Sequence, residues 1–349
     1  MTKQTFIILA VAAVISVAAA TASLTMQPRF TQVTGQGEYV FPDLLVNAAN
    51  VGTIAIIQDG APMTLELEPE GWTLAESGGH PIHDRLAAKV VLSLSELQLL
   101  EPKTKRKEKF ATLRLEDPMA PNSRGRSVAL KDKAGKDMGS VIVGRSNFSL
   151  PAVMTGGQYV RRSDSEQTWL ARGVIDLGVE PRDWLVREIM NVADTQIQRA
   201  TLRHSDGEIV EIVADAANQH GFRLVNLPEG KKLTTNYAPQ SVATVPSDFL
   251  LNDVRRNGDI NLAGEPSVHA EFALTGDVTI TLTLWREKPH NWMRVAVHYT
   301  GTQPDSDGAK LATELAKRTG SWIYDIPDYQ ADQMSKRVAD LVEDAGSGS

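Results

Sequence analysis

The chain has 349 residues, of which 42% are hydrophobic and 23% charged, with a formal net charge of −7 and no cysteine. This length and composition indicate about two globular domains and argue against a disordered chain. The acidic balance disfavours non-specific nucleic-acid binding. The lack of cysteine excludes disulfides, cysteine-bound zinc, iron–sulfur clusters, thiol nucleophiles and a lipidated cysteine.

The first expected element is a transmembrane helix over residues 6–26, FIILAVAAVISVAAATASLTM, which contains no charge. About 20 apolar residues in a helix span the hydrocarbon core of a bilayer. Lys3 precedes this segment, so the positive-inside rule favours a cytoplasmic tip of residues 1–5 and an outer location for the rest. A cleaved signal peptide is the alternative, because Ala20-Thr21-Ala22 resembles a cleavage site. The length of the apolar run favours the uncleaved signal anchor.

Small side chains recur along this expected helix at four-residue spacing: Ala12, Ser16 and Ala20 in one row, Ala18 and Ala22 in another. Rows of small residues let helix backbones approach closely in lipid. We therefore interpret these five residues as a candidate contact with a partner helix. The alternative is a weakly hydrophobic anchor in which the alanines have no such role.

An internal repeat organises the rest of the chain. In Val51–Glu76 the apolar residues alternate, and Asp59-Gly60 and Glu70-Gly71 interrupt them as turn signals. Ile197–Leu227 shows the same order, with Asp206-Gly207 at the first turn. Each segment thus reads as three strands in a meander.

The order of the following elements also matches between the two halves. Each half is expected to continue with a helix, an apolar strand, a strand pair and an aromatic-rich stretch. In the first half these are His83–Leu94, Ser95–Pro102, Ser127–Leu130 with Ser140–Val143, and Gln158–Leu170. In the second half they are Pro239–Phe249, Phe249–Val254, His269–Leu274 with Val278–Trp285, and Trp292–Tyr299; Gly308–Arg318 then forms a helix before Ser321–Tyr324.

These patterns predict an α+β protein with two related domains, rich in antiparallel sheet, after one N-terminal transmembrane helix. The first domain is expected at residues 27–192 and the second, duplicated domain at 193–345. We expect short helices at Pro181–Met190, between the domains, and at Gln330–Asp344. The Gly-Ser tail at 346–349 resembles a linker and carries no fold information.

No catalytic, cofactor or metal site is predicted. The chain has no P-loop, no dinucleotide-binding glycine motif, no nucleophile elbow and no H-E-x-x-H motif. His80 and His83 are the best metal candidates, but Pro81 breaks any helix that would hold both on one face. The acidic pairs Glu66/Glu68 and Glu208/Glu211 are better explained by strand alternation than by acid–base catalysis.

The sharpest charge feature is a basic stretch made of Lys103, Lys105, Arg106, Lys107 and Lys109. It is a candidate patch for an anionic partner, such as lipid head groups or an acidic protein surface. A solvated loop is the alternative, and the lack of interleaved aromatic residues before Phe110 argues against stacking on nucleic-acid bases.

Several segments resemble a family of bacterial envelope proteins with a domain of unknown function, encoded beside gliding-motility-type ABC transporter subunits. The segments that carry the resemblance are DG…EGWTLAE (Asp59–Glu76), LSLSELQLLEPKT (Leu92–Thr104), FATLRLEDP (Phe110–Pro118), VIVGR (Val141–Arg145), QYVRR (Gln158–Arg162) and TWLA…DWLVREI (through Ile189). The likeness covers most of residues 40–260 and includes no catalytic signature. It implies an accessory role beside a permease and an ATPase.

Three functions follow as hypotheses. The first is a non-enzymatic, single-pass accessory subunit of an ABC-type transporter in the bacterial inner membrane, with its N-terminus in the cytoplasm and its bulk in the periplasm. The second is a periplasmic module that binds a lipid or glycan without a transporter partner. The third and weakest is an envelope hydrolase. No cofactor is expected, and any small-molecule ligand stays open.

Overall fold

The computed structural model describes residues 35–149, 156–217, 221–262 and 264–346. The expected transmembrane helix, with Ala12, Ser16, Ala18, Ala20 and Ala22, lies outside these residues. Within the part of the chain that the structure describes, no helix has the length and hydrophobicity to cross a bilayer.

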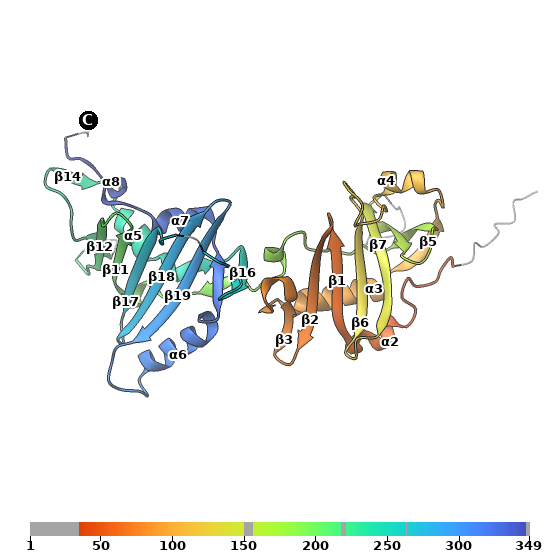
Figure 1. Ribbon diagram of the computed structural model, residues 1–349, viewed down its shortest axis with the longest axis horizontal. Coiled ribbons are helices and arrows are strands. Elements are labelled where there is room, and N and C mark those ends of the chain that lie inside the picture. The colour runs from red at the N-terminus through yellow and green to blue at the C-terminus, as the bar shows by residue number, and fades with distance from the viewer. Residues whose placement is uncertain (1–34, 150–155, 218–220, 263, 347–349) are drawn as a thin grey trace, which may run out of the picture.

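The protein is built from two large antiparallel sheets with few helices, so the expectation of a fold rich in antiparallel sheet is confirmed. The sheets lie one beyond the other along the long axis of the molecule (Figure 1). Buried and exposed side chains alternate along the strands. This alternation favours antiparallel sheets, because it gives each strand one apolar face that can pack in a core.

The first sheet has nine strands in the order β4-β3-β2-β1-β6-β7-β8-β9-β5. Its strands are β1 (Val51–Gln58), β2 (Ala61–Glu68), β3 (Gly71–Leu74), β4 (His80–Pro81), β5 (Gln98–Pro102), β6 (Arg126–Asp132), β7 (Asp137–Asn147), β8 (Gly157–Arg162) and β9 (Thr168–Arg172). The associated helices are α2 (Leu44–Asn47), α3 (Asp84–Ser95) and α4 (Phe110–Leu113), with 3-10 turns η1 (Ala48–Asn50), η2 (Ala75–Ser77) and η3 (Lys107–Lys109).

The second sheet has eight strands in the order β13-β12-β11-β17-β18-β19-β20-β16. Its strands are β11 (Ile197–His204), β12 (Ile209–Ala214), β13 (Phe222–Leu224), β16 (Asp253–Arg256), β17 (Val268–Leu274), β18 (Val278–Glu287), β19 (His290–Tyr299) and β20 (Trp322–Asp325). Its helices are α5 (Ala238–Ala243), α6 (Asp307–Thr319), α7 (Asp328–Met334) and α8 (Val338–Leu341), with η5 (Asp194–Gln196) and η6 (Val245–Asp248). Two small strand pairs flank this sheet: β10 (Glu188–Met190) with β15 (Phe249–Leu250), and β14 (Lys231–Leu233) with β21 (Val342–Asp344).

Apart from β4, the two sheets have the same strand order. Strands β3-β2-β1-β6-β7-β8-β9-β5 correspond one to one with β13-β12-β11-β17-β18-β19-β20-β16. The α3 helix precedes β5 in the first sheet, as α5 precedes β16 in the second. The meander at Val51–Glu76 and the two predicted strand pairs are present, with Val128 opposite Val141 and His269 opposite Thr283.

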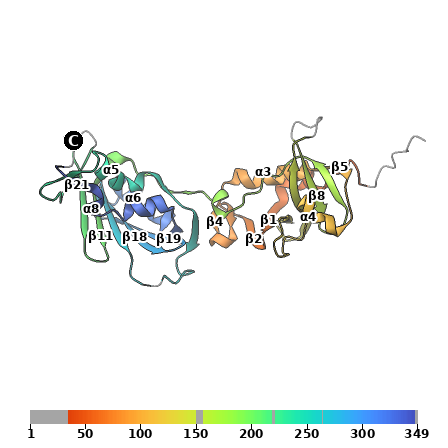
Figure 2. The ribbon, with the colours of Figure 1, turned by 90° about the horizontal axis from the view of Figure 1, so that it is seen from above.

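Each sheet buries one face in a shared main core. In β18, Val278, Ile280, Leu282 and Leu284 are buried, while the threonines between them are partly exposed. The same continuous hydrophobic cluster includes α3, α5 and α6 residues and extends through both sheets. Figure 2 shows α3 along the first sheet and α6 along the second.

The opposite, outer face of each sheet carries a smaller core. In the first sheet, Phe110 and Leu115 cover Ile142, Tyr159 and Leu170 of β7, β8 and β9. The covering residues belong to the connection between β5 and β6, residues 103–125, which we call the first cap. The second sheet has the equivalent arrangement. There the connection between β16 and β17, residues 257–267, is the second cap.

In the second cap, Ile260 and Leu262 contact Trp285, Trp292 and Ile323 of β18, β19 and β20. The caps therefore join equivalent strands and cover equivalent positions in the two sheets.

The helix expected at Pro181–Met190 is wrong. Only η4 (Pro181–Asp183) is helical, and the chain then runs extended into β10. Leu185 forms a β-bridge with Ile82, and the Val186 amide donates to the Pro81 carbonyl at 3.2 Å. These backbone pairings replace the bonds that a helix would need, so tertiary contacts override the local pattern.

The continuous helix expected at Gln330–Asp344 is also wrong, because the segment forms α7, α8 and β21. The Val338 amide donates to Glu208 at 2.9 Å, and Asp340 accepts from the Arg337 amide at 2.9 Å. These bonds start a new helix at Val338 instead of continuing α7.

Candidate functional site

The basic stretch lies at the start of the first cap and is held by strand-like hydrogen bonds. The Lys103 amide donates to the Thr168 carbonyl at 2.8 Å, and the Thr168 amide donates to the Thr104 carbonyl at 2.9 Å. The Thr104 amide also donates to the Thr168 hydroxyl at 2.9 Å. This ladder fixes the backbone, so the basic side chains extend from an ordered edge rather than from a loose loop.

All five basic residues are exposed, but they differ in their partners. Lys103 forms an ion pair with Glu101 at 2.7 Å, and Lys107 forms one with Glu166 at 2.8 Å. Within residues 35–149 and the other described ranges, Lys105, Arg106 and Lys109 form no ion pair. The prediction that this stretch meets an anionic partner remains a prediction, and three of its five charges are available for such a partner.

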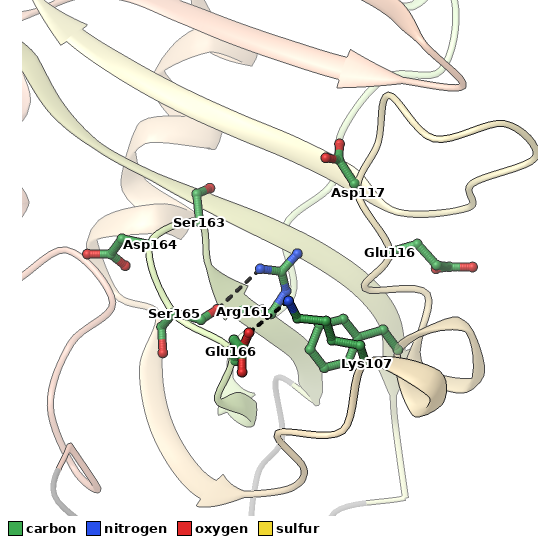
Figure 3. A pocket seen from close by; sticks show the side chains of 9 residues that line it. Lys107, Glu116, Asp117, Arg161, Ser163, Asp164, Ser165 and Glu166 are labelled. Carbon is green, nitrogen blue, oxygen red and sulfur yellow. Dashed lines mark hydrogen bonds and ion pairs between the residues drawn. The ribbon is translucent and has the colours of Figure 1, made fainter.

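An open cavity of about 540 Å³ lies beside this stretch. Lys107 and Phe110 of the first cap form one side, and Arg161, Asp164 and Glu166 of β8 and the following turn form the other. Glu116, Asp117, Ser163 and Ser165 complete the lining. Figure 3 shows the Lys107 amine directed at Glu166 and Arg161 directed at Ser165, while the Glu116 carboxylate points away from both.

Arg161 is fixed as part of the wall of this cavity. Its Nε and Nη2 donate to the Leu115 carbonyl at 3.4 Å each, and its Nη1 donates to the Ser165 carbonyl at 3.2 Å. The guanidinium also lies over the Phe110 ring, 4.9 Å from its centre. Burial lowers the pKa of Arg161, although Asp117 and Glu166 oppose that effect. Arg161 therefore anchors the first cap to β8.

The charges of this cavity favour recognition over acid–base catalysis. The hydrogen bond from Lys107, followed by the Lys107 charge, holds the pKa of the Glu166 carboxyl below its usual range. A general base needs a pKa near the working pH, so a carboxylate with a lowered pKa is poorly suited. The residues that line this cavity include neither histidine nor cysteine. Across the described ranges, no group of three or more His, Asp or Glu side chains is placed to hold a metal ion.

A second open cavity, of about 390 Å³, adjoins the same stretch. Lys105 and Arg162 line it together with Glu38 and Trp169. The sequence pattern marked Lys105 but not Arg161, Arg162 or Glu166, because these lie about sixty residues further along the chain. Arg161-Arg162 closes the QYVRR segment, and that adjacent pair of arginines was the signal available in the sequence.

Several of the residues considered and set aside for chemistry have structural contacts. Glu208 accepts a hydrogen bond from Arg337, and Glu211 pairs with Arg199 at 2.5 Å. His83 precedes the first turn of α3, and the His80 ring lies 4.9 Å from the Trp322 ring. These side chains thus contact other residues of the protein and contribute to its packing.

His80 belongs to the junction between the two sheets. The Ser77 hydroxyl donates to Asp253 at 3.0 Å, and the space beside Gly78 is filled by Arg256. The Arg256 guanidinium lies over the Trp322 ring, 4.9 Å from its centre. The junction is thus filled by side chains from both halves of the molecule.

The chain matches a known protein family. The family described as a domain of unknown function, DUF4340, matches residues 72–256. This match covers more than half of the chain. The chain belongs to the DUF4340 family. The expectation of an uncharacterised domain family is therefore confirmed.

The DUF4340 match begins in β3 of the first sheet and ends in β16 of the second. It includes the first cap and the junction residues Ser77, His80 and Arg256, but not Trp322. No curated protein and no solved structure matches the chain.

Proposed function

We propose that this DUF4340 protein is a membrane-anchored, non-catalytic accessory subunit of an ABC-type transporter of the gliding-motility kind. Residues 6–26 would anchor it in the bacterial inner membrane, with the N-terminus in the cytoplasm. The two sheets would contact partner subunits or substrate in the periplasm. The proposed partners are the permease and ATPase subunits, with the permease meeting the anchor.

The observation that supports this proposal most is the packed junction. One hydrophobic cluster runs through both sheets. Across the junction, the Ser77 hydroxyl donates to Asp253 at 3.0 Å, and the His80 ring lies 4.9 Å from the Trp322 ring. Trp184, in the segment that links the two halves along the chain, is buried at 2% exposure, and its carbonyl accepts from the His83 amide at 3.1 Å. A continuous core of this kind suits an extension that holds its shape between a membrane anchor and a distant partner.

The equal strand order supports the proposal that the second domain arose by duplication of the first. Duplicated units that stack end to end build a long body with repeated surfaces, which suits a scaffold. The first cap supplies a basic surface through Lys105, Arg106 and Lys109, where an acidic partner surface would be favoured.

A ligand-binding module is less well supported. Such a protein would hold a lipid or glycan in a cleft between its domains, since ligands commonly sit at domain interfaces. Here the contacts of Ser77, His80, Arg256 and Trp322 occupy that position.

The test is affinity purification of the full-length protein from its own membranes in mild detergent, followed by mass spectrometry. The proposal expects an ATPase and a permease to copurify. Substitution of the small-residue row, Ala12→Leu with Ser16→Leu and Ala20→Leu, should remove the permease, because bulky side chains prevent close helix contact.

The matched control changes three larger side chains that lie outside both small-residue rows of the proposed helix: Phe6→Leu, Val17→Leu and Leu24→Ile. This variant should keep both partners. Recovery of the protein alone from native membranes would contradict the proposal, and shortening near Ala22 would favour a cleaved signal peptide and the ligand-binding module.

A further inference from the structure

Three arginines converge on one cavity at the end of the first sheet. Arg126 begins β6 and lies opposite Gln58, the last residue of β1. Arg114 and Arg124 come from the first cap and line the same cavity, which has a volume of about 340 Å³. Cross-strand partners share a face, so Gln58 and Arg126 project to the same side of the sheet.

This cavity has an excess of positive charge. Asp59 is the one acidic residue among those that line it, against three arginines. Burial lowers the pKa of Arg126, Asp176 opposes that effect, and the nearby charge of Arg114 adds to it. Asp176 is shared, because it also forms an ion pair with Lys89 at 2.9 Å. The Arg126 guanidinium donates to the Leu177 carbonyl at 3.4 Å.

The backbone holds Arg114 in a conformation that arginine rarely adopts. Arg114 follows the last turn of α4 with φ of 58°, in the left-handed region where glycine is usual. The end of α4 lies directly on β7: a Cβ added to Gly144 would come within 2.2 Å of the Leu113 carbonyl oxygen. A charged side chain is thus kept at a position that favours glycine, and it faces two other arginines.

A polar group without a partner also lines the cavity. The Oε1 atom of Gln58 is buried and has no hydrogen-bond partner in the described part of the chain. The Gln58 side chain thus adds an unpaired polar group to the wall that the three arginines line.

We propose that Arg114, Arg124 and Arg126, with Gln58, form a binding site for a phosphate group. Guanidinium groups bind phosphate oxygens through paired hydrogen bonds, and three of them beside one carboxylate leave two positive charges. A phosphomonoester carries nearly two negative charges at neutral pH and matches that excess better than a carboxylate. Such a group is carried by a soluble phosphate or by the head group of an anionic lipid such as phosphatidic acid.

The site can be tested on the full-length protein in neutral detergent at constant ionic strength. The probes are inorganic phosphate and dihexanoyl phosphatidic acid, with dihexanoyl phosphatidylcholine as the zwitterionic control, and binding is measured by calorimetry. Saturable binding of inorganic phosphate identifies a soluble ligand, and binding of phosphatidic acid alone identifies a lipid head group. Both results support the site.

Variants assign the binding to these residues. Arg126→Gln and Arg114→Gly should each weaken binding at least tenfold. Arg114→Gly removes the charge and places the residue that this φ favours, so it is expected to fold. Arg172→Gln alters an exposed arginine at the end of β9, outside the cavity, and should leave affinity within twofold. Absence of saturable binding by both probes, or equal affinity in all variants, would overturn the proposal.

Discussion

The two caps show most clearly how the halves of the molecule differ. Both connect equivalent strands and cover an equivalent outer face, but the first cap contributes Phe110 and Leu115 and the second contributes Ile260 and Leu262. The first cap also carries the basic stretch and Arg114 and Arg124, whereas the second is short. The same strand order thus carries a charged surface in the first half and a compact apolar cover in the second.

This difference suggests where function lies in the chain. Sheets of equal strand order supply the scaffold, and the connections that differ supply distinct surfaces. An arginine lies over an aromatic ring in both outer cores: Arg161 over Phe110, and Arg294 over Trp285 at 5.4 Å. Both halves therefore have a cation–π contact in the outer core, while the open cavities described above lie in the first half.

The strongest test of the comparison removes the aromatic centre of each outer core. Phe110→Ala and Trp285→Ala should each lower the free energy of unfolding by about 3–5 kcal/mol, because each leaves a cavity among buried side chains. Denaturant unfolding of both variants provides the measurement. Tyr329→Ala is the control, since this aromatic side chain is exposed and should change stability by less than about 0.5 kcal/mol. A large loss in one variant alone would show that the caps are not equivalent.

The next largest effect is on the pH dependence of stability and comes from His80, at the junction between the two halves. Burial lowers the pKa of His80 to about 4, assisted by Arg318, while the hydrogen bond to the Pro81 carbonyl and the charge of Asp253 oppose this shift. The unfolded chain takes up this proton near pH 6.5, earlier than the folded protein. Stability is therefore lost as the pH falls from 6.5 to 4, by about 3 kcal/mol in total.

Unfolding free energies measured across this pH range should show a flatter dependence for His80→Gln than for the natural protein. His298→Gln, which alters an exposed histidine of β19, should keep the natural slope. If His80→Gln and the natural protein lose stability equally on acidification, His80 is not the group that couples the junction to pH.

A smaller and opposite effect is expected at Arg114. Arg114→Gly should raise the free energy of unfolding by about 1 kcal/mol, because glycine adopts a positive φ without the Cβ penalty. Arg172→Gly, within β9, should lower it by about 0.5–1 kcal/mol. Thermal unfolding of the two variants, compared with the natural protein, checks the sign. A loss of stability in Arg114→Gly would mean that the side chain holds the first cap in place.

The smallest effect on stability is expected for substitutions in the basic stretch. Lys107 and Glu166 are both largely exposed, so solvent screens their ion pair. Lys107→Ala should leave the unfolding midpoint unchanged within error. The recovery of acidic partners in copurification should instead fall in Lys105→Ala and Lys109→Ala, whose amines form no ion pair in the described residues. A marked loss of stability in Lys107→Ala would indicate a structural role for the ion pair.

Many of the strands and turns of the fold could be predicted from the local sequence. The Asp59-Gly60 turn has positive φ at both residues, 51° and 74°, as Asp-Gly turns between strands require. Alternation placed the strand pairs, and helical spacing placed α3. The segments at Pro181–Met190 and Gln330–Asp344 were predicted as helices because their local pattern is helical, but distant partners such as Ile82 and Glu208 set their structure.

The candidate sites were only partly visible in the sequence. The basic stretch is a local run, so composition was enough to find it. Strand pairing brings Arg161 and Arg126 close to the first cap, although they are distant from parts of it in the sequence. A local sequence pattern does not predict contacts of this kind. The left-handed backbone at Arg114 likewise depends on how closely α4 lies on Gly144 of β7.

The most direct test of the account is photo-crosslinking in native membranes from a photoreactive residue placed at Ser16. The accessory-subunit proposal predicts an adduct with a permease, identified by mass spectrometry, and no such adduct from Val17, which lies outside both small-residue rows of the proposed helix. The account would be contradicted if position 16 gave no adduct and the mature protein began near Ser23.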